Sequence, residues 1–390
     1  GGHVYGGSIY TGGIGTLLTS FLNSRERGKD IQNICLQCGT CNTVCGGKLD
    51  IAGMILKLRT KFAQEDGLNP VHKFCLDTVA DRHLFHSMLR IASVAQGMIT
   101  KGQPMIRHLP MFLSGLTAGR SLPSVAPQPF RDILLTIKQD VPNPKGKIAI
   151  FTGCLLDFVY VDIATDVVKA LNMAGYIVEM PLGQACCGAP ATYMGDVENA
   201  KKAAALNLNA MEAEKYDYIV SACPTCTHAL RDYVDFFKDD PEMLKKAEEL
   251  RSKTFDFCKL VSMLGGLPDT GDGVPMKVTY HDSCHLNRYL GVTKEQRELL
   301  KATKGVELIE MHDCDKCCGF GGSYSVKFPE MSAPILEEKI NNIVASGADV
   351  VAVDCPGCLL QIRGGLDARG LNNIQVKHTA QIVVEKREKK

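Results

Sequence analysis

Ten cysteines fall into two blocks with one spacing pattern, and this pattern constrains the fold more than any other feature of the chain. In the first block, 31 residues separate a single cysteine from a Cys-Cys-Gly triplet, and 34 residues separate that glycine from a Cys-Pro-x-Cys motif. In the second block the gaps are 32 and 35 residues. Shared offsets over so many residues indicate an internal duplication. The block members are Cys154, Cys186, Cys187, Cys223 and Cys226, and then Cys284, Cys317, Cys318, Cys355 and Cys358.

The residues around these cysteines predict alternating strands and helices. KIAIFTGC and KVTYHDSC are each typical of a buried strand that ends at a cysteine, and DYIVSACPTC and DVVAVDCPGC repeat this pattern. Helical segments such as 161–175 lie between them. Because strand–helix alternation is typical of α/β units, we expect the cysteines to lie beyond the carboxyl ends of strands. The fold class predicted is therefore α/β, with two duplicated domains over 147–270 and 271–390.

A third group of cysteines precedes the blocks as C-x2-C-x2-C-x3-C, formed by Cys35, Cys38, Cys41 and Cys45. This spacing is typical of a 4Fe–4S cubane cluster, for which thiolates are the ligands. A structural zinc knuckle is the alternative, although zinc sites favour two separated pairs. Gly46 stands where proline usually follows such a run. Either all four thiolates hold one cubane, or a further run precedes Gly1, Cys45 serves that second cluster, and the first cluster takes a ligand from upstream.

Five thiolates in each block are one more than a cubane needs. The adjacent pair can bridge or cap irons, so we expect two 4Fe–4S clusters in the duplicated domains and leave cubane and noncubane forms open. Zinc sites or buried free thiols are the alternatives. Disulfides are disfavoured, because the seventeen cysteines are odd in number and adjacent cysteines bridge only with strain. We expect Gly188 and Gly319 to permit close approach of the backbone to a cluster, and Cys75, Cys258 and Cys314 to be small buried residues.

The residues before the blocks predict helices and then a linker. Apolar residues recur at helical spacing over 49–63 and 72–100, so residues 1–100 are expected to form a helical, ferredoxin-like segment. Prolines then interrupt regular structure, and residues 101–146 are expected to be a linker. The prolines are Pro104, Pro110, Pro123, Pro127 and Pro129.

Composition excludes few classes of function, but it gives no support for nucleic-acid binding. The formal net charge is +1, so no strong field attracts a polyanion. No stretch of eighteen uncharged apolar residues predicts a membrane span. We expect a cytoplasmic protein and leave open a peripheral contact with the inner face of a membrane.

The second block is richer in groups that carry chemistry. His281 and His285 flank Cys284, whereas FTGCLLD surrounds the matching Cys154. Histidine moves protons near neutral pH, and an arginine or lysine binds carboxylates, so we predict a catalytic set of His281, His285, Arg288 and Lys327. Under the alternative, the two histidines only hydrogen-bond cluster sulfurs and tune the potential.

The two blocks resemble the cysteine-rich CCG domain of heterodisulfide reductase B subunits, glycolate oxidase iron–sulfur subunits and lactate-utilisation iron–sulfur proteins. The resemblance covers roughly residues 146–388. YHDSCHLNRYLG at 280–291 and CCGFGGSYSVKFPEMS at 317–332 are similar to the lactate-utilisation CCG subunit. GGHVYGGSIYTGGIGTLLTSFL, followed by the cysteine run, resembles the carboxyl-terminal part of the ferredoxin-bearing subunit of that system. The chain thus resembles a fusion of two subunits, and we expect its beginning to be missing.

The resemblance implies an iron–sulfur electron-transfer component of an L-lactate-oxidising system, which converts lactate to pyruvate and passes electrons to a quinone or another carrier. It implies further redox subunits as partners, with a flavin or lactate-utilisation subunit among them. A heterodisulfide reductase-type enzyme, which cleaves disulfides on noncubane clusters, is the second possibility. A zinc-stabilised scaffold without redox activity is the third.

Overall fold

A computed structural model describes residues 12–100, 105–106, 121–268 and 273–388. Residues Gly1–Thr11, which carry most of the predicted GGH segment, lie outside these ranges, as does most of the first half of the predicted linker. Two four-stranded parallel sheets with flanking helices confirm the predicted α/β class. No helix in the described ranges is long and apolar enough to cross a bilayer.

The two sheets have the same topology, which is the structural expression of the duplication. In the first repeat the strand order is β4-β3-β5-β6, and in the second it is β8-β7-β9-β10, so each sheet places its first strand between its second and third. All neighbouring strands in both sheets are parallel. The strands are β3 (Gly146–Ile150), β4 (Tyr176–Glu179), β5 (Tyr218–Ser221), β6 (Thr254–Asp256), β7 (Met276–His281), β8 (Val306–Leu308), β9 (Val350–Val353) and β10 (Gln375–Lys377).

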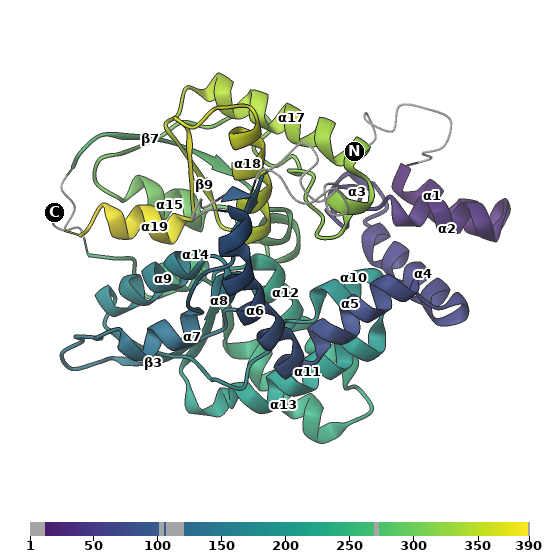
Figure 1. The fold of residues 1–390 in the computed structure, drawn as a ribbon, viewed down its shortest axis with the longest axis horizontal. Coiled ribbons are helices and arrows are strands. Elements are labelled where there is room, and N and C mark those ends of the chain that lie inside the picture. The colour runs from purple at the N-terminus through teal and green to yellow at the C-terminus, as the bar shows by residue number, and fades with distance from the viewer. Residues whose placement is uncertain (1–11, 101–104, 107–120, 269–272, 389–390) are drawn as a thin grey trace.

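Helices cover the two sheets and pack the repeats against each other (Figure 1). One hydrophobic cluster contains Ile148 and Val220 from the first sheet and Val351 and Val353 from the second, so the repeats share a core. The helices of the first repeat are α7 (Phe130–Ile133), α8 (Leu155–Phe158), α9 (Val161–Met173), α10 (Ala189–Met194), α11 (Val197–Met211), α12 (Pro224–Asp232), α13 (Pro241–Lys253) and α14 (Phe257–Met263). Those of the second are α15 (Glu295–Lys301), α16 (Tyr324–Lys327), α17 (Pro329–Ser346), α18 (Pro356–Ala368) and α19 (Thr379–Glu385).

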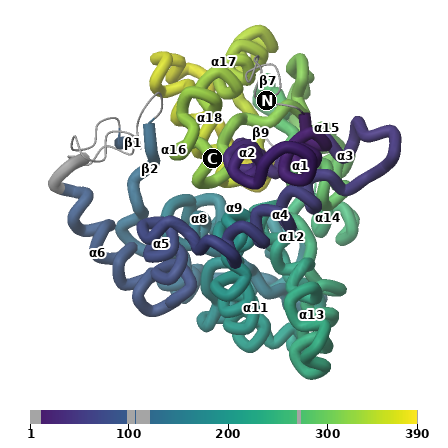
Figure 2. Tube along the Cα trace, turned by 90° about the vertical axis from the view of Figure 1, so that its right-hand side faces the viewer, coloured from purple at the N-terminus to yellow at the C-terminus, as the bar shows by residue number. Residues whose placement is uncertain are grey.

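The N-terminal segment is helical, as predicted. Figures 1 and 2 both place its first helices at the junction of the two repeats. Gly195 of the first repeat has a left-handed φ of 84°, and a Cβ there would lie 3.0 Å from the backbone of Arg59 on α4, so glycine permits this close packing. The elements are α1 (Gly12–Leu22), α2 (Arg25–Asn33), α3 (Thr40–Val44), α4 (Ile51–Asp66), α5 (Pro70–Ala80), α6 (Arg82–Thr100) and the antiparallel pair β1 (Met105–Ile106) and β2 (Leu122–Pro123).

Candidate metal centre

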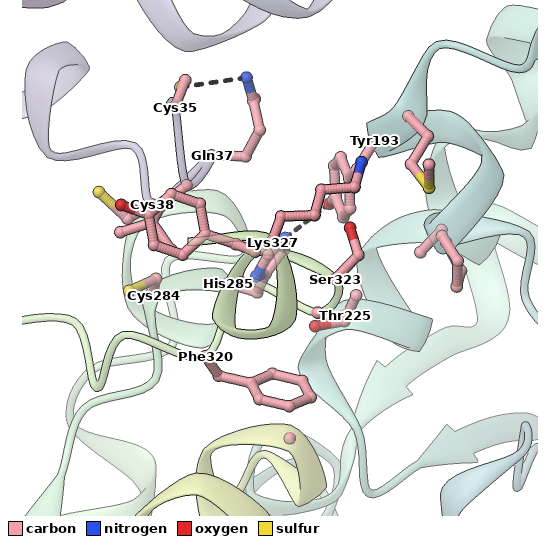
Figure 3. A pocket seen from close by; sticks show the side chains of 18 of the residues that line it. Cys35, Gln37, Cys38, Tyr193, Thr225, Cys284, His285, Phe320, Ser323 and Lys327 are labelled. Atoms are coloured by element: carbon pink, nitrogen blue, oxygen red, sulfur yellow. Dashed lines mark hydrogen bonds between the residues drawn. The ribbon is translucent and has the colours of Figure 1, made fainter. Parts of the chain in front are cut away.

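One cavity lies where the N-terminal segment meets the two repeats (Figure 3). Its volume is about 870 Å³, and its walls come from all three parts of the chain. All ten block cysteines line it, together with Cys35 and Cys38 of the first run. Cys41 and Cys45 are not among its lining residues, and they pack instead against the apolar cluster formed by α1 and α4. Cysteines up to 323 residues apart in the chain, from Cys35 to Cys358, therefore face one space.

The thiols of the two repeats form one continuous chain of hydrogen-bonded neighbours. In the first repeat the order is Cys154, Cys186, Cys187, Cys226 and Cys223. In the second repeat the matching order is Cys284, Cys317, Cys318, Cys358 and Cys355. Cys223 contacts Cys355 and joins the two halves. The arrangement therefore has two equivalent sets of five thiols that meet at corresponding cysteines.

Secondary structure explains why the first cysteine of each Cys-Pro-x-Cys motif faces the cavity. Cys223 and Cys355 follow buried strands and are the N-cap residues of α12 and α18, whose first residues are prolines that favour a helix start. The amino-terminal N–H groups of such helices favour thiolates.

The glycine of each Cys-Cys-Gly triplet packs closely against a neighbouring helix. Gly319 has a φ of 84°, and a Cβ there would lie 2.8 Å from the carbonyl oxygen of Ser332 on α17. Gly188 has the same left-handed backbone, and its Cβ would lie 3.3 Å from the carbonyl oxygen of Ala200 on α11. Both glycines thus permit close packing of a neighbouring helix.

Buried thiols at these positions differ in how readily they ionise. Hydrogen bonds from Cys186 and Cys226 lower the pKa of Cys187. Hydrogen bonds from their neighbours likewise lower the pKa values of Cys317 and Cys355. Each repeat thus holds at least one thiol poised to ionise, and thiolate is the form that binds metal.

Unpartnered polar atoms beside the thiols test whether a metal cluster fits this site. His281 is fully buried, and within the described ranges neither ring nitrogen has a hydrogen-bond partner. Its ring lies within 4.8 Å of the sulfurs of Cys318 and Cys358. Burial of such an imidazole without a partner is costly. The soft sulfur donors and this orphaned ring together fit an iron–sulfur group.

His281 has no counterpart in the first repeat, where Phe151 stands at the matching position three residues before the lone cysteine. Burial and the nearby Lys339 ammonium lower the pKa of His281 to about 3, so the ring is neutral. His281 does not line the cavity. His281 thus lies against the thiols of Cys318 and Cys358 from outside the cavity.

His285 does line the cavity, where it contacts the first repeat. Its Nε2 atom lies 2.6 Å from the hydroxyl oxygen of Tyr193 on α10. Its ring stacks on Tyr289 with centroids 5.0 Å apart and lies 5.7 Å from His228. Burial and the nearby His228 lower the pKa of His285 to about 4, so its imidazole is also neutral. His285 and Tyr193 thus form a neutral polar pair across the interface between the repeats.

Comparison with known proteins supports the duplication. The model of the CCG cysteine-rich domain matches residues 148–231 and again 278–363. Lactate utilization protein A of Shouchella clausii is 39% identical over 240 residues, which cover 61% of this chain and 99% of that protein. Lactate utilization protein A of Bacillus subtilis is 36% identical over 238 residues, or 61% of this chain and 98% of that protein. The chain belongs to this CCG cysteine-rich domain family.

One solved structure also aligns, at a lower level of similarity. The crystal structure of a hypothetical protein from Helicobacter pylori has a TM-score of 0.45 and 11% identity, and the alignment covers 96% of this chain and 74% of that one.

The second CCG repeat contacts the N-terminal cysteine run directly. Nη1 of Arg288 lies 3.4 Å from the carbonyl oxygen of Cys38, and Nη2 donates to the carboxylate of Asp315 at 3.0 Å. The hydroxyl of Tyr289 donates to the carbonyl oxygen of Gln37 at 3.0 Å. Arg288 was predicted to bind a substrate carboxylate. Its guanidinium instead pairs with Asp315 and contacts the cysteine run, and it does not line the cavity.

Other cations lie near the thiols of the two CCG repeats. Lys339 is buried and donates to the carbonyl oxygens of Asp313 and Cys314, at 2.6 and 3.2 Å. The corresponding residue of the first repeat is the neutral Asn207, which donates to the carbonyl oxygen of Cys186 at 2.9 Å. Both side chains therefore support the loop that carries the paired cysteines, but only the second adds a positive charge.

The remaining cysteines follow the prediction only in part. Cys258 is fully buried, as expected, whereas Cys75 is exposed and Cys314 is half-buried. The Cys314 thiol contacts Asp282 at 3.3 Å, because it lies beside the Asp282–Arg297 ion pair.

Sequence reasoning also missed functional neighbours of the cysteines, notably Tyr193 and Arg59. Arg59 donates to the carbonyl oxygens of Tyr193 and Cys35 at 2.7 and 3.0 Å, and so ties α4 to the first CCG repeat. No local spacing marks either residue, since both act through contacts between distant segments.

Proposed function

We propose that this chain is an iron–sulfur electron-transfer component of a system that oxidises L-lactate to pyruvate. The continuous chain of thiols, which joins both CCG repeats within one cavity, carries the proposal. The name of the curated relatives, lactate utilization protein A, supports lactate as the substrate of the system. In this reaction, L-lactate loses two electrons and two protons, and the electrons pass to a quinone or another carrier.

Three sets of cysteines would hold the clusters. Cys35, Cys38, Cys41 and Cys45 would hold a 4Fe–4S cubane, unless Cys45 serves a cluster of an upstream run. The two sets of five block cysteines would each hold one 4Fe–4S cluster, cubane or noncubane. Such clusters, when bound, accept and release one electron at a time.

The proximity of the Cys284 and Cys38 thiols favours an order of electron transfer. The Cys38 thiol is close enough to Cys284 to influence its pKa. Arg288 lies near both sulfurs. We therefore propose that electrons pass directly between the N-terminal cysteine run and the second CCG repeat.

The cavity also offers groups for the protons that leave lactate. The neutral His285 imidazole accepts a proton, and the Tyr193 hydroxyl, 2.6 Å away, relays it toward the first repeat. His281 is the weaker choice for this role, because it does not line the cavity. We assign His281 to the surroundings of the thiols, where it would influence the reduction potential.

The curated relatives account for 61% of this chain, so the remainder needs a separate origin. We propose that the part with the Cys35 run corresponds to the ferredoxin-bearing subunit of the same system, fused to the CCG subunit. Other redox subunits, with a flavin or lactate-utilisation subunit among them, are the proposed partners, and a peripheral contact with a membrane would give access to quinone.

Visible absorption of anaerobically purified protein tests this proposal. Bleaching of the iron–sulfur bands by L-lactate, with no effect of L-lactamide, is the expected result. If L-lactate has no effect and a disulfide substrate reoxidises the reduced protein, the chain is a heterodisulfide reductase-type enzyme instead. Glycolate serves as the third substrate, because it differs from lactate by one methyl group.

A further inference from the structure

The charged lysine and arginine side chains of the cavity wall have no acidic counterparts among the described lining residues. Among the described residues that line it, three are lysines or arginines and none is an aspartate or glutamate. A cavity with cations and no carboxylate favours anions. Cluster-bound thiolates are one source of negative charge. A cation of the wall that pairs neither with them nor with another protein group is available to a bound anion.

Two of the three cations already have partners. Lys29 pairs with Asp66 at 2.8 Å. Arg59 donates to Gln32, Tyr193 and Cys35, and the Cys35 thiol favours its charge. Both side chains are therefore committed to the protein.

Lys327 is the cation without a partner. Its ammonium has no hydrogen bond or ion pair within the part of the chain that the structure describes, although the side chain is only partly exposed. Burial and the charge of Arg59 lower its pKa. The thiols influence the pKa values of Arg288 and Lys339 but not that of Lys327. Lys327 therefore lies apart from the clustered sulfurs.

The groups around Lys327 suit a small hydroxy acid. Figure 3 shows Lys327 and Tyr193 extending into the same part of the cavity, with His285 and Ser323 nearby. Phe320, Phe328 and Met194 supply apolar surface to the same cavity. A carboxylate at Lys327 would leave the hydroxyl end of the molecule free to face the His285–Tyr193 pair.

We propose that Lys327 binds the carboxylate of a small 2-hydroxy monocarboxylate in this cavity, and so sets the substrate class. This inference rests on the proposed function for the hydroxy acid, but the anion site itself does not. Lys327 thus takes the role of carboxylate ligand that was predicted for Arg288, because Arg288 pairs with Asp315.

Calorimetric binding measurements on the anaerobic, cluster-loaded protein test the inference. L-lactate, pyruvate, L-lactamide and inorganic phosphate are the probes, and the variants are Lys327→Met, Lys327→Arg and, as a control, Lys29→Met. Lys29 lines the same cavity but has its own carboxylate. We expect lactate and pyruvate to bind and lactamide to bind at least about tenfold more weakly, since a charge-assisted hydrogen bond is lost. Lys327→Met should lose about tenfold or more in lactate affinity, Lys327→Arg should retain most of it, and Lys29→Met should retain all of it.

Three outcomes would overturn the inference. Equal lactate affinity in Lys327→Met and the wild type would remove Lys327 from the site, provided that both have the same iron content. Phosphate that binds as tightly as lactate would leave a general anion site and not a monocarboxylate site. A shift of cluster potential in Lys327→Met without loss of lactate affinity would show that the Lys327 charge acts on the clusters and not on a bound carboxylate. Carboxylate binding at Lys327 without reduction by lactate would contradict the proposed function alone.

Discussion

The thiols of Cys223 and Cys355 are hydrogen-bonded neighbours, although 131 residues lie between them in the chain. Each is the first cysteine of its Cys-Pro-x-Cys motif, so equivalent points of the two CCG repeats meet. Metal bound in one repeat would therefore lie beside metal bound in the other. Under the proposed function, this contact would make the pair of repeats a single redox unit.

Close clusters predict magnetic coupling. In fully reduced protein, the electron paramagnetic resonance spectrum should show spin–spin interaction between the clusters of the two repeats. Cys355→Ser removes a predicted ligand of the second repeat and should leave an uncoupled signal with about four fewer irons per chain, the content of one cluster. Cys75→Ser is the control, because Cys75 is exposed and does not line the cavity, and it should match the wild type. Independent signals in the wild type would contradict the proposed contact.

Variants of the two histidines of the second repeat should distinguish a role in proton transfer from a role in setting the reduction potential. His285→Ala should lower lactate-dependent turnover about 10²-fold or more, since it removes a proton acceptor from the cavity. His281→Phe copies the first repeat, where Phe151 is fully buried at the matching position, and it should shift a cluster potential while turnover is largely retained. Iron content should stay unchanged in both variants. Lost turnover in His281→Phe at an unchanged potential would reverse these assignments.

Arg288 should raise the reduction potential of the clusters beside it. A fixed positive charge near Cys284, Cys38 and Cys317 favours the reduced, more negative state. Arg288→Met should therefore lower a potential by tens of millivolts, where about 59 mV corresponds to a tenfold change in a one-electron equilibrium constant. Arg288→Lys keeps the charge and should recover most of the shift. Spectroelectrochemical titration gives the result, and a potential that does not move would show that the charge is screened.

Asp256 should make stability depend on pH. It is the N-cap residue of α14, and one of its carboxylate oxygens is buried without a partner in the described ranges. Burial and the nearby Asp354 charge raise its pKa from 3.8 to about 8. The folded state therefore holds a proton that the unfolded state releases, and stability falls as pH rises from about 4 to about 8.

Asp256→Asn keeps the cap oxygen and removes this ionisation. Its stability relative to wild type should increase with pH by about 1 to 3 kcal/mol between pH 5 and pH 8. Thermal unfolding of the anaerobic protein at both pH values measures the difference. A difference that is the same at both pH values would contradict the raised pKa.

Cysteine spacing predicts most of the fold and the thiol set because both depend on local sequence. KIAIFTGC forms a strand and delivers Cys154 for reasons present in those eight residues. The contact of Cys223 with Cys355 depends instead on how two domains pack. The contact of Tyr193 with His285 also depends on how the two domains pack. The pairing of Arg288 with Asp315 could not be predicted from the spacing of the cysteines. Exposure of Cys75 also depends on which face of α5 packs against the rest of the protein.

Iron and acid-labile sulfide in anaerobically purified protein test the central claim most directly. Three four-iron clusters predict about twelve irons per chain, with an equal amount of sulfide. Folded protein that contains zinc, or no metal, in place of iron would contradict the account.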